Sequence, residues 1–455
     1  MKLNKIMLGA AALALGTGAF AQTVTFHSGI DYTTWGLTQT RFGGDETREN
    51  TKPSAGYDKD GNMTVDVSVR AQSFEFNLGL YFNADGGNQE YYDFSDDVNT
   101  SFYQGNMKVG FFNDQVSVYT GKFEDFNGGY IAEGAVLGDQ YITNLADSDY
   151  GQYLTGLEFA PQMLSQLKFF VGVPILPTHG NGIPDKEFDQ WKILYKKVKF
   201  AASYQLPNDM SINAGFRPGT YYDGVDNVDN GAMSTATKAF TESMFGEGYL
   251  QALIPNLADK VNLVASYDIR YRDAEYLTKA NTTKEHKAFA HTVGLSAEIA
   301  LSEELTLGLE DRVFYAGDDY VTSDEKLLYN IFAVNGEYAV PGTQCSVGLG
   351  LAGIFASDAN GKGFVDDDGV AYANNGAYAT HGDIALTLND MATTGANGGD
   401  ATKYMGAYAN PYFKYNFANG DLTIGAEVAF TRAFTDDYSN TCLSYRIPVG
   451  LKFQF

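Results

Sequence analysis

The sequence LSYRIPVGLKFQF, from Leu443 to Phe455, alternates between apolar and non-apolar residues over its whole length. Its odd positions are all apolar, and its even positions are polar, charged, glycine or proline. Because successive side chains of a β-strand point to opposite faces, a period of two predicts a strand with one apolar and one polar face. We therefore expect a half-buried strand here, with the aromatic Phe455 as its last residue.

The same alternation recurs along the chain and predicts an all-β protein. It is clear at 63–71, 73–83, 261–271 and 421–432, where every second residue is apolar and the spacing does not fit a helix. We expect eighteen strands, with sixteen or fourteen as alternatives because two strands have ambiguous parity and one is unusually long. They lie near 23–36, 63–71, 73–83, 102–112, 115–123, 151–160, 166–174, 188–206, 210–217, 246–255, 260–272, 288–300, 305–315, 326–339, 344–355, 403–417, 421–432 and 441–455.

The connections between these strands alternate in length. The short turns lie at 113–114, 161–165, 207–209, 302–304, 341–343 and 419–420. The long polar stretches are 37–62, 84–101, 124–150, 218–245, 273–287 and 356–402. Such alternation is typical of a transmembrane antiparallel up-and-down β-barrel with short periplasmic turns and long extracellular loops.

The first residues of the chain have the features of a secretory signal peptide. Two lysines precede an apolar stretch from Ile6 to Leu15, and Ala19-Phe20-Ala21 offers small residues for cleavage. The apolar stretch is shorter than the roughly 18 residues that a spanning helix needs. We expect residues 1–21 to be removed by cleavage after Ala21, and residues 22–455 to form a single barrel domain.

The chain also resembles a large class of membrane proteins. An exported chain that crosses a membrane without a spanning helix must close its strands into a barrel, because lipid satisfies no unpaired backbone group. The final strand with its terminal aromatic resembles the closing strand of bacterial outer-membrane β-barrels of the porin type. The resemblance implies an outer-membrane location in a Gram-negative-type (diderm) bacterium, with outer-membrane lipids as partners, and it leaves a homotrimer open. It also implies that the barrel-assembly machinery recognises Leu451, Phe453 and Phe455.

The charge balance argues against nucleic acid as a partner. Acidic residues outnumber basic residues 56 to 31, and the formal net charge is −25. The acids cluster in the predicted loops, for example at Asp366 to Asp368. Two interpretations stay open: a solvated surface that maintains solubility, or an acidic mouth that concentrates cations.

Motifs that could carry chemistry are better explained as parts of strands and loops. Gly348, Gly350 and Gly353 match a dinucleotide fingerprint by spacing, but they lie in an alternating run that no helix follows, and we interpret them as small lumenal residues. The stretch from Asp358 departs from a calcium loop, since Gly369 stands where a bidentate Glu is needed. The five histidines show no HExxH spacing, and no G-x-S-x-G elbow is present. We expect no cofactor, no metal site and no catalytic residue.

Three residues test the strand assignment. Cys345 opens one strand near its periplasmic end and Cys442 opens the last strand near its extracellular end, so a barrel height of about 25 Å separates them and predicts two free thiols. Pro448 interrupts the closing strand, because proline cannot donate a ladder hydrogen bond. We expect a local bulge or one missing bond there.

Charged residues of both signs alternate with the apolar sets and predict a polar barrel interior. They are Asp66, Arg70, Glu75, Lys108, Lys122, Glu158, Lys168, Asp268, Arg270, Arg272, Glu298, Glu310, Arg312, Glu427, Arg446 and Lys452. Such charges are tolerated when water fills the interior, and sixteen to eighteen strands leave an aqueous channel. We expect a channel for passive diffusion of small hydrophilic solutes, in which an acidic mouth would favour cations.

Residues 124–150 form the third long loop. In general diffusion porins, which this plan resembles, the third loop folds inward and narrows the pore. Ile131, Val136 and Leu137 are too apolar for a freely solvated loop, which favours the same arrangement here. The candidate residues of the constriction are Glu133, Asp139, Lys108, Lys168, Arg270 and Arg312.

Two other functions fit the same fold. A sugar-selective channel would show an aromatic track inside the barrel and saturable flux. A surface adhesin or structural barrel would use its loops and would show no flux.

Overall fold

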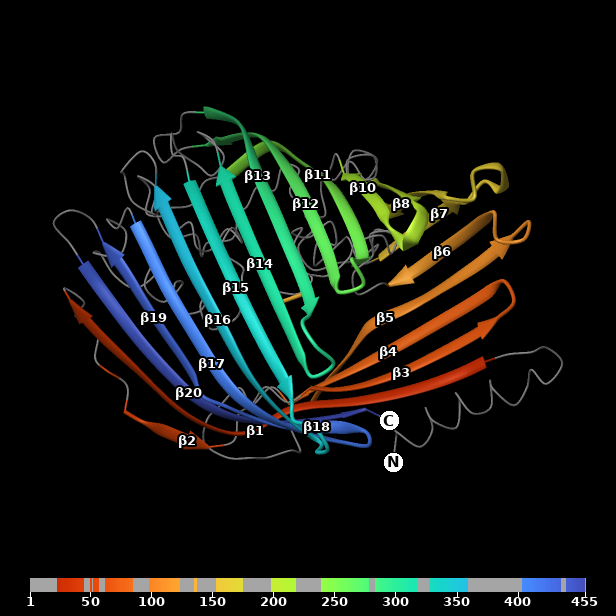
Figure 1. Ribbon diagram of the computed structural model, residues 1–455. Coiled ribbons are helices and arrows are strands. Elements are labelled where there is room, and N and C mark those ends of the chain that lie inside the picture. The colour runs from red at the N-terminus through yellow and green to blue at the C-terminus, as the bar shows by residue number, and fades with distance from the viewer. Residues whose placement is uncertain are drawn as a thin grey trace.

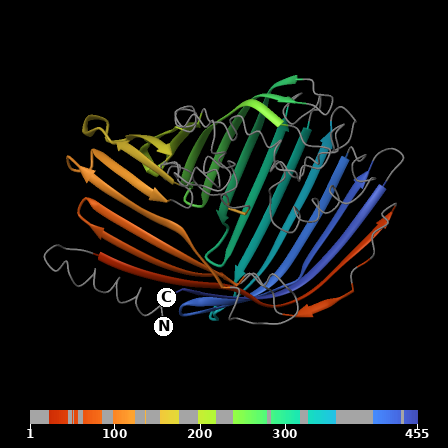
Figure 2. The ribbon, with the colours of Figure 1, turned by 180° about the vertical axis from the view of Figure 1, so that it is seen from behind.

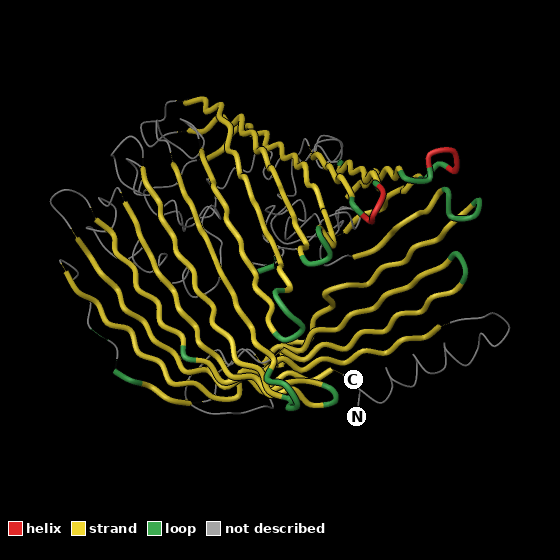
Figure 3. Tube along the Cα trace, viewed as in Figure 1, coloured by secondary structure: helices red, strands yellow, loops and turns green. Residues whose placement is uncertain are grey.

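The computed structural model describes most of the predicted strand regions. The described residues are 23–44, 50, 52–56, 62–84, 98–122, 135–136, 153–174, 198–217, 239–277, 283–316, 327–358, 403–434 and 439–454. Within them the chain is almost entirely strand (Figure 3), and the helical turns are η1 (Gln162–Leu164) and η2 (Pro207–Asp209). None of the helices in this part of the chain is long and apolar enough to cross a membrane.

The strands follow one another with short turns at one end. They are β1 (Thr23–Gly44), β2 (Ser54–Gly56), β3 (Asn62–Ala71), β4 (Phe74–Ala84), β5 (Val98–Phe111), β6 (Val116–Lys122), β7 (Tyr153–Phe159), β8 (Leu167–Pro174), β9 (Lys199–Gln205), β10 (Ser211–Arg217), β11 (Ala239–Leu257), β12 (Val261–Leu277), β13 (Thr283–Ala300), β14 (Leu305–Ala316), β15 (Leu327–Ala339), β16 (Cys345–Asp358), β17 (Lys403–Phe417), β18 (Gly420–Gly425), β19 (Glu427–Phe434) and β20 (Ser439–Gln454).

All of these strands belong to one antiparallel sheet that closes on itself. Apart from β2 with β3 and β18 with β19, strands that are consecutive in the chain pair with each other, and β1 pairs with both β3 and β20. Figure 1 shows β1, in red, beside β20, in dark blue, and Figure 2 shows the same neighbours from behind. The fold is therefore the all-β antiparallel up-and-down barrel that the alternation predicts.

Twenty strands are assigned where the sequence predicts eighteen, and two interruptions explain the difference. β2 pairs with the same edge of β1 as β3 does, so these two segments share one position in the ring. β18 and β19 both lie between β17 and β20, so they share another position. The described strands therefore fill eighteen positions around the barrel.

The break between β18 and β19 lies between two prolines. The N–H of Ala426 donates to the carbonyl of Pro411 at 3.0 Å. In a regular ladder the carbonyl of Ala426 would accept from the N–H of residue 411, but proline has no N–H to donate. By the alternation of an antiparallel ladder, Gly425 has the same relation to Pro448, whose Cγ lies 3.4 Å from the site of a Cβ on Gly425. A register shift between Thr33 and Trp35 of β1 adds to the irregularity. The disturbance expected at Pro448 is thus confirmed.

Several strand boundaries extend beyond the predicted ones. β1 continues to Gly44 and β2 follows it, so part of the stretch 37–62 predicted as a loop is strand. β12 and β13 also extend into the predicted loop 273–287. The predictions placed strand ends where polar residues begin, whereas the polar extensions are stabilised by backbone pairing to their neighbours.

The two faces of the sheet have opposite chemistry. Leu157, Val293 and Phe332 are each 53% exposed, whereas Asp268 and Arg312 are 2% and 4% exposed. Because alternate residues of a strand share a face, the exposed apolar side chains form the outer surface and the buried polar ones project into the barrel. This distribution reverses that of a water-soluble protein and is the one expected of a wall with lipid outside.

Candidate functional site: the lumen of the barrel

Five ion pairs lie on the lumenal face of the described strands. They are Arg70–Glu75 at 3.0 Å, Lys108–Glu158 at 3.3 Å, Arg312–Glu310 at 2.9 Å, Lys414–Glu337 at 3.9 Å and Arg446–Glu427 at 2.6 Å. Their register positions alternate with the exposed apolar residues, as the sequence predicts for a lumenal set.

One part of the lumen is filled. We call the middle of the lumenal face of β12 to β14, with Ser266, Asp268, Ser296, Glu310 and Arg312, the filled wall, because these polar side chains have almost no contact with water. The side chains of Glu310 and Arg312 are 0% and 4% exposed, and Ser296 is 2% exposed. Both Nε and Nη2 of Arg312 donate to Oε1 of Glu310, at 3.1 and 2.9 Å. A buried carboxylate of this kind needs such a partner to remain charged.

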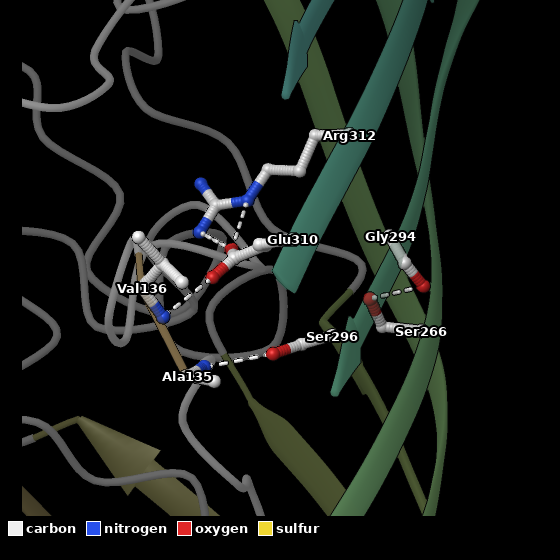
Figure 4. A network of polar contacts seen from close by, with 7 residues as sticks. All are labelled: Ala135, Val136, Ser266, Gly294, Ser296, Glu310 and Arg312. Carbon is white, nitrogen blue, oxygen red and sulfur yellow. Dashed lines mark hydrogen bonds and ion pairs between the residues drawn. The ribbon is translucent and has the colours of Figure 1, made fainter. Parts of the chain in front are cut away.

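Two residues of the third long loop contact the filled wall. The N–H of Ala135 donates to Oγ of Ser296 at 2.7 Å, and the N–H of Val136 donates to Oε2 of Glu310 at 3.1 Å (Figure 4). A Cβ on Gly308 would lie 2.9 Å from Cγ2 of Val136, so this glycine leaves the room that the valine occupies. The loop tip at Ala135 and Val136 is therefore held inside the barrel, in agreement with the inward folding expected for residues 124–150.

A second part of the lumen is open. We call the part of the lumenal face of β3, β4, β19 and β20 that carries Arg70, Glu75, Glu427 and Arg446 the open wall; nearer the long connections, Ala429, Thr431 and Cys442 on the same face are buried. The side chain of Arg70 is 72% exposed and that of Glu75 is 28% exposed. The side chain of Arg446 is 33% exposed although its Nε donates to Oε2 of Glu427 at 2.6 Å. Charged groups on this wall are thus paired and still reach water.

The six predicted constriction residues have different surroundings. Lys108 lies 4.9 Å above the ring of Tyr119 as well as contacting Glu158. Lys168 is exposed on β8, three strands away from Lys108. Arg270 lies opposite Glu247 and Ala290 in register.

Arg312 is paired with Glu310 of its own strand, so it is not the open basic group that the constriction hypothesis needs. Glu133 and Asp139 lie outside the described residues. The structure brings Lys108 near Glu158 but does not bring Lys108, Lys168 and Arg312 together.

Two further lumenal residues, Glu337 and Lys414, were not predicted from the sequence. Glu337 accepts hydrogen bonds from Ser346 and from the hydroxyl of Tyr412, both at 2.8 Å, and pairs with Lys414. Lys414 stands between Phe413 and Tyr415, which are 40% and 41% exposed, so the alternation of this strand does carry the signal. Glu337 was not predicted because it lies in the predicted strand 326–339, one of the two whose parity is ambiguous.

An apolar cluster also lies inside the barrel. Phe170 and Leu154 are 1% exposed and pack with Ala201 and the partly buried Tyr119. A Cβ on Gly156 would come within 2.4 Å of the Phe170 ring, so this glycine makes space for the ring. Part of the lumen near β6 to β9 is therefore packed as a small core rather than hydrated.

Two of the three residues predicted as the assembly signal are described. Phe453 packs against Phe417 with ring centroids 5.0 Å apart, and Leu451 follows the same alternation; Phe455 lies outside the described residues. Cys345 begins β16 and Cys442 lies near the beginning of β20, and because these strands run in opposite directions the two residues lie at opposite ends of the barrel. Both cysteines are free, as the sequence predicts.

The glycine fingerprint is only partly lumenal. Gly348 lies under the lumenal ring of Tyr412, whereas Gly353 lies under the outer ring of Phe332. The described residues contain no cluster of three or more His, Cys, Asp or Glu that could hold a metal ion.

Comparison with known proteins finds only distant similarities. No family model matches the chain, and no curated protein is detectably similar in sequence. Similar solved structures include the outer membrane channel DcaP of Acinetobacter baumannii, at 11% identity and a TM-score of 0.43 over 95% of this chain and 97% of that chain. They also include OpdQ of Pseudomonas aeruginosa, at 10% identity and a TM-score of 0.43 over 95% and 98% of the two chains.

A third is the outer-membrane expressed OmpT of Vibrio cholerae, at 12% identity and a TM-score of 0.42 over 96% of this chain and 98% of that chain. At identities this low, function has to be argued from the residues of this chain itself.

Proposed function

We propose that this protein is an outer-membrane channel for passive diffusion of small hydrophilic solutes. The observation that carries the proposal is the closed ring of strands with apolar side chains outside and ion pairs inside. The side chain of Arg446 is 33% exposed on the open wall. A charged group that is exposed inside a barrel requires water around it, so this part of the lumen is hydrated.

The loop tip at Ala135 and Val136 supports a narrowed pore. It lies against Ser296 and Glu310 of the filled wall, so it occupies part of the lumen. Water then fills the space beside the open wall. Solutes would then pass between the loop tip and residues such as Arg446, and the fixed loop would set a size limit.

Liposome swelling with sugars of increasing size tests the channel. We expect flux that falls with solute size and does not saturate. Saturable flux would support the sugar-selective alternative, and the absence of flux would support an adhesin or structural barrel. A matched pair of variants on β18 sharpens the test: Thr423→Trp, at a lumenal position, should reduce flux, whereas Ile424→Trp, on the outer face, should not.

Cation preference is a finer part of the same proposal. It rests on the formal charge of −25 and on the acids concentrated in the long connections. The reversal potential across a bilayer with a KCl gradient should indicate preferential passage of potassium. A reversal potential that indicates chloride preference would contradict it.

The biogenesis that goes with this function is also a proposal. Export, removal of residues 1–21, barrel-assembly machinery acting on the last strand, and insertion among outer-membrane lipids all follow from the sequence features described above. The N-terminal sequence of the protein isolated from membranes should begin at Gln22, and chemical cross-linking in membranes would show whether it forms a trimer.

A further inference from the structure

Two arginines lie on the outer face of the barrel wall, on either side of β20. Arg41 of β1 lies opposite Leu443, and Arg432 of β19 lies opposite Thr441. Directly opposed residues of antiparallel strands share a face. Leu443 is 38% exposed on the outer surface, so both arginines belong to that surface, and both are exposed.

The position of Arg41 is fixed by neighbouring polar groups. Its Nη2 donates to Oε1 of Gln39 at 3.4 Å, and the hydroxyl of Tyr445 donates to the same oxygen. Gln39 is only 7% exposed although it lies on the outer face. The contact of Arg41 that the structure describes is therefore with a neutral amide, which positions the guanidinium without neutralising its charge.

A hydroxyl lies between the two arginines. Thr441 is opposite both Arg432 and Gly43, and its Oγ1 would lie 2.9 Å from a Cβ on Gly43. Neighbouring strands are about 4.8 Å apart, so the backbones that carry the two arginines are separated by about 10 Å. Nε of Arg432 donates to Oγ of Ser439 at 3.0 Å, and Nη2 of Arg41 reaches toward Gln39, so the two guanidinium groups point away from each other along the strands. To hold one group above Thr441, both side chains must turn toward it, which their length allows. Figure 1 shows β1, β20 and β19 next to one another here.

Apolar side chains continue the surface below this group. Leu443 and Ile447 of β20 and Phe430 and Val428 of β19 are between 37% and 43% exposed. Arg41 and Arg432 lie near the ends of β1 and β19 that lead into the long connections. The surface thus presents positive charge at the edge of an apolar belt, a combination that matches a lipid with an anionic headgroup.

We infer that Arg41, Thr441 and Arg432 bind the phosphate of a lipid headgroup in the leaflet on the side of the long connections. Guanidinium groups bind phosphate through paired, charge-assisted hydrogen bonds, and a hydroxyl can add a third donor. The apolar residues below would contact the acyl chains. This inference rests on the proposed membrane location of the barrel but not on its conductance.

Native mass spectrometry of the folded protein with dioleoyl phosphatidic acid tests the inference. The Kd of the bound lipid should rise about tenfold in Arg41→Gln and by more in the double variant with Arg432→Gln, because one charge-assisted contact changes Kd on the order of tenfold. Arg41→Lys should weaken binding less than Arg41→Gln. The control is Lys260→Gln, which removes an exposed cation in the turn between β11 and β12, at the end of the barrel away from the long connections, and should leave the Kd unchanged.

Three results would overturn the inference: equal lipid binding by wild type and the double variant, an equal loss in Lys260→Gln, or displacement of the lipid by inorganic phosphate at the lipid's own concentration. The last would show a site for free phosphate. The β-sheet circular dichroism of each variant shows whether it is folded. If the wild type fails to conduct and still binds the lipid through these arginines, the channel proposal fails and the inference stands.

Discussion

The filled wall and the open wall contain the same chemical unit in two environments. Glu310 and Arg312 form a carboxylate–guanidinium pair whose side chains are 0% and 4% exposed, beneath the tip of the third long loop. Glu427 and Arg446 form another pair whose side chains are 12% and 33% exposed. The comparison teaches that an ion pair does not by itself mark the pore. The buried pair holds the loop residue Val136, whereas the pair that faces water can interact with passing ions.

The pairings along the sheet show where its register is broken. Those of β12 with β13, β13 with β14, β3 with β4 and β19 with β20 continue without a register shift. β18 and β19 are interrupted between Pro411 and Pro448, β1 shifts register between Thr33 and Trp35, and β11 shifts twice against β12. The breaks therefore lie beside both walls, and the one between the prolines borders the open wall.

The largest expected difference between the walls is in stability. Arg312→Met leaves Glu310 buried without its cation and should lower the free energy of unfolding by about 3–5 kcal/mol. Arg446→Met is the matched control and should lower it by about 1 kcal/mol or less, because Glu427 can still be hydrated. Urea titration of the folded barrel in detergent, followed by tryptophan fluorescence, measures both. Equal losses would mean that the two walls are equally filled.

The second expected difference is in conductance. Gly308→Leu should displace Val136 from the filled wall, since even a Cβ at this position comes within 2.9 Å of the valine. Releasing the loop tip should raise single-channel conductance, and deletion of residues 128–142 should raise it further. Gly350→Ala is the control, because a Cβ there meets its nearest neighbours at 3.8 Å. Unchanged conductance in both loop variants would show that the loop does not narrow the pore.

The smallest expected difference concerns the break in the open wall. Pro448→Ala restores an N–H opposite Gly425 and should raise the free energy of unfolding by about 1 kcal/mol, the usual net value of one hydrogen bond. Pro341→Ala, in the turn between β15 and β16, should change it by less than about 0.5 kcal/mol. The same urea titration compares them. A loss of stability in Pro448→Ala would indicate that the ladder already satisfies that carbonyl.

The sequence predicted the ring well, for a physical reason. A residue in the wall meets lipid or lumen, so its polarity reports its face directly, and the alternation along 443–455 or 421–432 is enough to place a strand. Pro448 could be recognised in the same way, because its missing N–H is a property of the residue itself. The strand ends could not, since polar extensions such as 37–44 depend on partners distant in the chain.

The candidate site was predicted less completely. The lumenal face of Lys108 and Arg312 follows from alternation, but their partners do not. Arg312 pairs with Glu310 two residues away because the loop tip buries both, and that burial depends on a contact between Val136 and β14 across the barrel. A long-range contact of this kind leaves no periodic signal in the sequence.

The most direct test of the account is the reaction of single cysteines with a charged, water-soluble thiol reagent during conductance recording. In a chain with Cys345 and Cys442 replaced by serine, Thr423→Cys lies at a lumenal position beside the open wall and Ser296→Cys lies on the filled wall; Ile424→Cys lies on the outer face.

The account predicts rapid reaction and reduced conductance at position 423, slow reaction at position 296 and none at position 424. Equal rates at 423 and 296, or rapid reaction at 424, would contradict a water-filled lumen with one filled and one open wall.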